Sequence, residues 1–170
     1  MTSKSYSAVA AIAGMLVLGS AGTVLANKDD RPGSRALAGT WLVQVQLRIC
    51  ATQDPLGAPF YSLLTFARGG TLTGTTSGPQ FAPGQRTGDF GVWNDTGRRT
   101  FNAETEAFIL ADSAATPPGL KRGLQRISQT IAIQKGDPNR FGSVAKVEFF
   151  DTNSVLLISG CATATGQRFE

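Results

Sequence analysis

The chain contains no histidine, and this absence removes much ordinary enzyme chemistry from consideration. Ser–His and Cys–His nucleophilic catalysis need an imidazole as the general base, and many metal sites need it as a ligand. Cysteine is limited to two residues, so a thiolate metal site lacks ligands and no CxxC redox pair exists. The sequence therefore predicts no metal site, no cofactor and no catalytic residue with a recognisable signature.

Concentrated charge is also absent, because the 16 basic and 12 acidic residues are scattered along the chain. Proteins that bind nucleic acid normally gather positive charge on one surface. We therefore expect no nucleic-acid partner. Among the acidic residues, Glu104 and Glu106 share one face of an expected strand, where a carboxylate pair could do acid–base work. We interpret that face as a solvated outer surface.

Long apolar runs are missing after the amino terminus. Lys4 precedes an apolar segment over residues 8–18, and Val24-Leu25-Ala26 offers small or aliphatic residues at a signal-peptidase site. This run is shorter than the roughly 20 residues that a membrane-spanning helix needs. We predict a signal peptide over residues 1–26 with cleavage near Ala26. The mature chain would have no stable membrane span and would be exported to the periplasm or the extracellular space.

The chain that follows has the size of one domain. Residues 27–38 are polar and are predicted to be a flexible segment, which leaves residues 39–170 as a single β domain. Apolar and polar residues alternate with a period of two, most clearly over residues 41–49 and 124–134. Such alternation is typical of strands that are buried on one face only.

The pattern predicts eight strands that are joined mainly by hairpin turns, which favours an all-β, antiparallel, up-and-down arrangement. Closure of such a sheet into an eight-stranded barrel removes the exposed edges that invite aggregation. A proline- and glycine-rich stretch over residues 77–87 is expected to form a long loop. The expected strands cover residues 41–49, 60–67, 71–76, 90–94, 99–110, 124–134, 141–150 and 155–164.

Cys50 directly follows the first expected strand, and Cys161 lies in the last one. Two cysteines outside the cytosol usually pair. Closing a loop of about 110 residues removes denatured-state entropy equivalent to roughly 4–5 kcal/mol. Because the first and last strands of an up-and-down barrel are neighbours, we predict a disulfide across the closing seam on the outer face. The prediction requires Cα atoms less than about 7 Å apart.

The interior of an eight-stranded barrel is either filled by side chains or leaves room for one small apolar ligand. The alternation does not choose between these two states. Gln129 falls among inward-facing isoleucines, and a buried glutamine needs partners, either a polar contact in the interior or a neighbouring side chain. The residues expected to face the interior and to bind a ligand there are Trp41, Val43, Val45, Leu47, Ile127, Gln129, Ile131, Val147 and Phe149.

Two short motifs resemble a known barrel family. Gly39-Thr40-Trp41, at the start of the first expected strand, resembles the Gly-x-Trp opening of lipocalins and the broader calycin barrels. Arg168 resembles the arginine that packs on that tryptophan in the family. The resemblance implies a calycin-like barrel.

A second resemblance covers most of the chain after the signal peptide. It is to a group of secreted bacterial β-barrel proteins without an assigned activity, with allene-oxide-cyclase-like barrels as neighbours. In that group the position before Gly91 is often histidine, whereas this chain has Phe90, so proton transfer at that position is not available. The resemblance implies export and fold but no activity. The similar segments are residues 64–72, 82–86, 91–93, 160–164 and 166–169.

Three functions remain open. The first is an exported, non-catalytic barrel that binds a small hydrophobic or amphipathic molecule in its interior. The second is an isomerase or cyclase of the allene-oxide-cyclase-like type, which needs a cavity with a buried ionisable or strongly polar group. The third is a structural or protein-interaction module with a filled barrel. The volume and the lining of the interior distinguish the third function from the first two.

Overall fold

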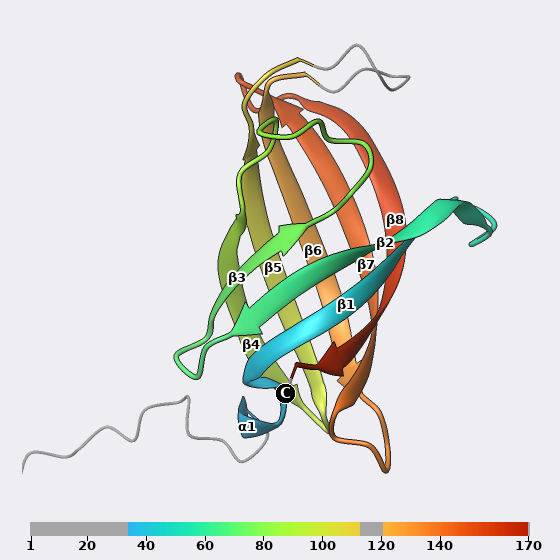
Figure 1. Ribbon diagram of the computed structural model, residues 1–170, viewed down its shortest axis with the longest axis vertical. Coiled ribbons are helices and arrows are strands. Elements are labelled where there is room, and N and C mark those ends of the chain that lie inside the picture. Colours follow the sequence, from blue (N-terminus) through green and yellow to red (C-terminus); the bar gives the residue numbers. More distant parts are fainter. Residues whose placement is uncertain (1–33, 113–120, 170) are drawn as a thin grey trace, which may run out of the picture.

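The computed structural model describes residues 34–112 and 121–169. Within these ranges the chain forms a closed barrel of eight antiparallel strands in up-and-down order, which confirms the fold predicted from the sequence (Figure 1). One short helix, α1 (Ser34–Leu37), precedes the barrel. The strands are β1 (Gly39–Arg48), β2 (Pro55–Phe66), β3 (Thr71–Thr76), β4 (Asp89–Gly97), β5 (Thr100–Ile109), β6 (Gly123–Ile133), β7 (Arg140–Asp151) and β8 (Leu156–Arg168).

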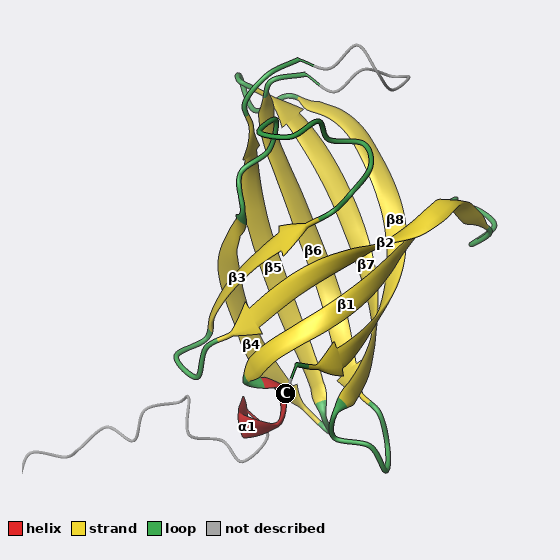
Figure 2. Ribbon diagram, in the orientation of Figure 1, coloured by secondary structure: helices red, strands yellow, loops and turns green. Residues whose placement is uncertain are grey.

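Most loops lie at the two ends of the barrel, and the loop between β1 and β2 projects to one side (Figure 2). The loop over residues 77–88 crosses the end opposite α1 (Figure 2). It is attached to β5 by an isolated bridge between Arg86 and Ile109 and by a 2.7 Å hydrogen bond from the Leu110 amide to the Gln85 carbonyl. The loop therefore has a fixed position over one end of the barrel.

The barrel end beside α1 is filled by large apolar side chains. The ring centroids of Trp41 and Phe141 lie 4.9 Å apart, and Trp93 contacts Phe66 and Phe101 at 6.0 and 5.8 Å. These separations are typical of aromatic pairs that stabilise a core. The complete cluster consists of Leu37, Trp41, Val43, Leu64, Phe66, Leu72, Trp93, Phe101, Ala103, Ile131, Ile133 and Phe141.

The described part of the segment before β1 contacts the core of the barrel. It contains α1, and the side chain of Leu37 is fully buried in the core. Trp41 Nε1 donates a 2.8 Å hydrogen bond to the Leu37 carbonyl. Composition alone did not reveal this contact, because a single large apolar residue in a polar stretch gives no periodic signal. The predicted signal peptide over residues 1–26 lies outside the described residues.

Arg168 of β8 covers the same end of the barrel. Its guanidinium carbon lies 4.3 Å from the centroid of the Trp41 ring, which is the contact that the resemblance to calycin barrels implied. Its two terminal nitrogens donate hydrogen bonds of 2.7 Å to the carbonyls of Ala38 and Ala36. This one side chain therefore joins α1 and the chain before β1 to the last strand.

Replacing Arg168 by alanine is expected to lower the free energy of unfolding by about 2 kcal/mol, because two carbonyls lose a charged donor and Trp41 loses its cover. Urea denaturation measures the change. Arg140→Ala is the matched control, because the Arg140 side chain is exposed and forms a surface ion pair with Asp137. The control should change stability by less than about 0.5 kcal/mol. Equal effects of the two substitutions would show that the Arg168 contacts contribute nothing specific.

The predicted disulfide is present between Cys50, just after β1, and Cys161 on β8, with Cα atoms 5.2 Å apart. Arg48, the last residue of β1, pairs directly with Cys161. The bridge therefore lies at one end of the β1–β8 seam, where the barrel closes. Cys50 is exposed, which agrees with the outer position expected from strand parity.

Candidate functional site: the barrel cavity

The barrel is hollow in the half opposite α1, where a cavity of about 410 Å³ lies between the strands. This volume falls within the range of small-molecule pockets. Its wall is mostly apolar and consists largely of inward-facing side chains, while the loop over residues 77–88 adds Gln80, Phe81 and Arg86. Phe81 lies against Phe149 of β7, with ring centroids 6.4 Å apart. The loop is therefore part of the wall and not only a connection.

Most of the residues that the sequence placed in the interior line this cavity. Trp41 and Ile131 do not, because they are fully buried in the packed half of the barrel. Strand parity decides which side chains point inward, but it does not tell how far along the barrel the packing extends. The predicted residues on the cavity wall are Val43, Val45, Leu47, Ile127, Gln129, Val147 and Phe149.

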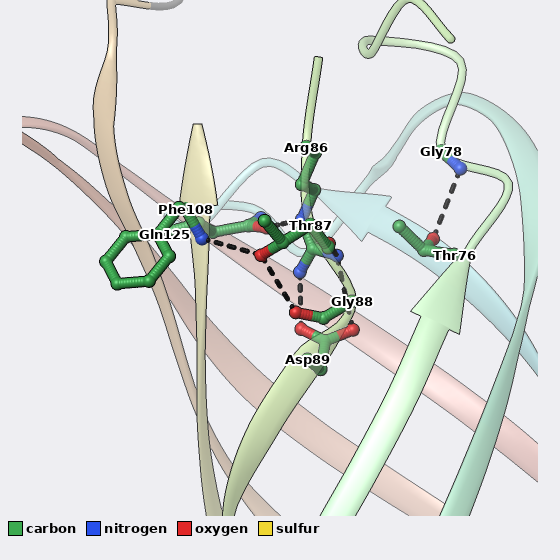
Figure 3. A network of polar contacts seen from close by, with 8 residues as sticks. All are labelled: Thr76, Gly78, Arg86, Thr87, Gly88, Asp89, Phe108 and Gln125. Atoms are coloured by element: carbon green, nitrogen blue, oxygen red, sulfur yellow. Dashed lines mark hydrogen bonds and ion pairs between the residues drawn. The ribbon is translucent and has the colours of Figure 1, made fainter. Parts of the chain in front are cut away.

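A buried ion pair between Arg86 and Asp89 lies on the cavity wall (Figure 3). Their side chains are only 4% and 5% exposed. Both terminal nitrogens of Arg86 donate to the carboxylate, one of them to Oδ2 at 3.3 Å. Arg86 Nε donates to Gln125 Oε1 at 2.5 Å, and Nη1 donates to the Thr87 carbonyl at 3.0 Å. The charge of Arg86 is therefore neutralised within the wall.

Arg86, Asp89 and Gln125 were not among the residues predicted to form the site. Strand parity could have identified two of them, because Asp89 shares the inward face of β4 with Trp93, and Gln125 shares that of β6 with Ile127. No such signal exists for Arg86, which lies in a loop. Its pairing with Asp89 depends on the path of that loop.

The carboxylates on β5 and β7 face away from the cavity. Arg126 lies 3.9 Å from Glu104 and 2.6 Å from Glu106 on the outer surface, which agrees with the solvated face expected for these two residues. The hydrogen bonds that Arg126 donates to the Glu106 carboxylate raise the pKa of Arg126 above its ordinary value. Glu148 pairs with Lys146 at 2.6 Å. None of these three glutamates lines the cavity.

Two polar atoms on the cavity wall, Ser143 Oγ of β7 and Gln80 Oε1 of the loop, are buried without a hydrogen-bond partner among the residues that the structure describes. Ser143 as a whole is only 7% exposed. Buried polar groups in folded proteins are nearly always hydrogen-bonded. The cavity wall therefore carries polar groups that a bound molecule can satisfy.

Within residues 34–112 and 121–169, no group of three or more histidine, cysteine, aspartate or glutamate side chains is arranged to hold a metal ion. The same described ranges contain no helix with the length and apolar character needed to cross a bilayer. A scan against protein-family models and a search of curated proteins gave no match to this chain.

Proposed function

We propose that this protein is an exported, non-catalytic barrel that binds one small amphipathic molecule in its interior. The observation that carries the proposal is the cavity of about 410 Å³, with a mostly apolar wall and the unpartnered hydroxyl of Ser143. Protein interiors are normally close-packed, so an empty space of this size forgoes many contacts unless a ligand fills it. A completely filled barrel, as a purely structural module would have, does not fit this half of the molecule.

Export is the second part of the proposal. It is supported by the signal-peptide pattern over residues 1–26 and by the Cys50–Cys161 disulfide. Disulfides persist mainly in oxidising compartments such as the periplasm and the extracellular space. Kinship with calycin barrels is proposed on the Gly39-Thr40-Trp41 motif together with the stacking of Arg168 on the Trp41 ring.

An isomerase or cyclase is the second candidate, because the cavity wall contains one buried ionisable pair, Arg86–Asp89. Such an enzyme would use the pocket to exclude water and to hold one substrate conformation. Asp89 is less suited to act as a general base, because both of its oxygens already accept hydrogen bonds from Arg86. Analysis of the bound molecule after incubation separates the two candidates: a binding protein returns it unchanged, whereas an isomerase returns a rearranged product.

Filling the cavity tests the proposed function. The wild-type protein should bind one molecule of the apolar fluorophore N-phenyl-1-naphthylamine per barrel. Ala145 lies on the cavity wall, so Ala145→Phe places a phenyl ring in the space that the probe needs. We expect this substitution to weaken binding at least about tenfold, a difference of about 1.4 kcal/mol, in a fluorescence titration.

The matched control is Val144→Phe, which adds the same ring one residue earlier on β7. Val144 is 60% exposed on the outer face, so its replacement should leave probe affinity unchanged. The absence of saturable binding to the wild-type protein would contradict the proposed function. Equal affinities of the wild-type and Ala145→Phe proteins would place the probe outside the cavity.

A further inference from the structure

We propose that the ligand of this cavity is an uncharged amphiphile that carries a hydroxyl group, and that the hydroxyl binds between Gln129 and Ser143 at the inner end of the cavity. The inference rests on the proposed function and narrows its ligand class to aliphatic or alicyclic alcohols. The ligand would therefore enter with its polar group first, and its apolar body would contact the apolar wall in the half of the barrel opposite α1.

Gln129 and Ser143 lie where the packed core ends and the cavity begins. Among the inward-facing residues of β7, Ser143 comes next to Phe141, and on β6 Gln129 comes next to Ile131. Both Phe141 and Ile131 belong to the core cluster. Ile131 pairs directly with Ser143, whereas Gln129 pairs with Ala145. Gln129 and Ser143 are therefore diagonal neighbours on the inner wall, a spacing of about 7–8 Å between Cα atoms, and one ligand group can reach both.

In the described part of the chain, neither of these two side chains forms a hydrogen bond with another residue. In the described ranges Ser143 Oγ is buried and unpartnered, and the half-buried Gln129 lines the same cavity. Its neighbours Ser128 and Thr130 form hydrogen bonds with Glu104 and Asn102 of β5. A direct bond between the two is absent from the same ranges. The sequence left two explanations for Gln129, a neighbouring side chain or a polar contact in the interior, and this geometry favours the second.

The chemistry of the two groups selects a neutral partner. A hydroxyl and a carboxamide each donate and accept hydrogen bonds, and neither carries a charge. A ligand hydroxyl, which also donates and accepts, complements both. A carboxylate in the same place would be buried without a counter-ion, and this is among the most unfavourable arrangements in a protein interior.

The two arginines of the cavity wall do not offer a carboxylate site. Arg86 is already paired with Asp89, so an anionic ligand would lie beside a carboxylate of the same charge. Arg48 has the outward parity of β1, and its guanidinium donates to Thr163 Oγ1 at 3.0 Å and to the Gln53 carbonyl at 3.2 Å. The innermost part of the cavity therefore has polar groups but no unpaired charge.

Isothermal titration of the wild-type protein with 1-decanol, decanoate and decane at neutral pH tests the inference. We expect 1-decanol to bind at least about tenfold more tightly than decanoate. Ser143→Ala and Gln129→Leu should each weaken 1-decanol binding by about three- to tenfold, the effect of one neutral hydrogen bond, and should leave decane affinity unchanged. Thr130→Ala is the control, because Thr130 follows Gln129 on β6 and is exposed on the outer face.

The ranking of the three probes uses the wild-type chain, so it stands even where a variant fails to fold. Decanoate that binds as tightly as 1-decanol would overturn the inference and would point to Arg48 or Arg86 as the anchor. Equal affinities for 1-decanol and decane would also overturn it, because the polar group would then contribute nothing. The proposed function survives both of these results, whereas binding of none of the three probes would contradict it.

Discussion

Replacing Cys50 and Cys161 by serine lowers the free energy of unfolding by about 4 kcal/mol, because the disulfide closes a long loop and so restricts the unfolded chain. The two residues are 111 positions apart. Their link restricts the unfolded chain far more than the folded one. In the folded chain β1 and β8 are already paired along the seam, from the Trp41–Arg168 pair to the Arg48–Cys161 pair. Guanidinium denaturation under oxidising conditions measures the loss.

Reduction provides the internal control for this experiment. Wild-type protein in excess dithiothreitol should unfold at the same denaturant concentration as the double serine variant, and the variant itself should not respond to dithiothreitol. A double variant that is as stable as the oxidised wild-type protein would show that the bridge does not stabilise the closing seam.

Replacing Asp89 by asparagine is expected to lower the free energy of unfolding by about 3 kcal/mol, because it leaves a buried guanidinium without its counter-ion. The Arg86 and Asp89 side chains are 4% and 5% exposed, so water screens the remaining charge poorly. Asparagine keeps the size of the side chain, which separates the effect of charge from that of packing. Thermal and urea unfolding both report the change.

A double substitution, Arg86→Met with Asp89→Leu, tests whether the stability lost in Asp89→Asn is due to the unpaired charge of Arg86. It removes both charges and fills a similar volume, and such replacements of buried ion pairs are often neutral or stabilising. The double variant should therefore recover most of the stability that Asp89→Asn loses. A double variant as unstable as the single one would assign the loss to the shape of the side chains and not to the unpaired arginine.

Much of the fold followed from the sequence because its signals are local. Alternation in β1 fixed the buried face, hairpin turns fixed the strand order, and the two cysteines located the seam. Local hydrogen bonds hold two of the turns: Asp95 Oδ1 accepts a 2.7 Å hydrogen bond from the Gly97 amide, and Asp151 Oδ1 accepts one of 2.8 Å from the Asn153 amide. Each of these features depends on neighbouring residues or on one pairing rule.

The strand ends did not follow in the same way. β2 begins at Pro55, before the expected start at Phe60, and its first residues are exposed, so they give no alternation. β8 continues beyond Ala164 through Gly166, where a Cβ atom would lie 2.2 Å from Cε1 of Phe141. Glycine is normally a weak strand residue. Here it makes room for an aromatic ring from the neighbouring strand, and a single sequence does not display such a contact.

The extent of the cavity could not be predicted from the sequence for a similar reason. Large aromatic side chains fill the end beside α1, whereas several inward positions of β7 and β8 next to this packed end carry small residues. Parity assigned the interior face, but the size of these residues decides where the packing stops. The small residues on this part of the wall are Ser143, Ala145, Gly160, Ala162 and Ala164.

The most direct test of the central claim is native mass spectrometry of the protein purified from the organism that produces it. The cavity of about 410 Å³ predicts a complex with one small molecule per chain, which dissociates when the protein is denatured. The contrary result is a spectrum that contains the chain alone, both after purification and after incubation with an organic extract of the same cells. That result would contradict the claim that the hollow half of the barrel is a binding site.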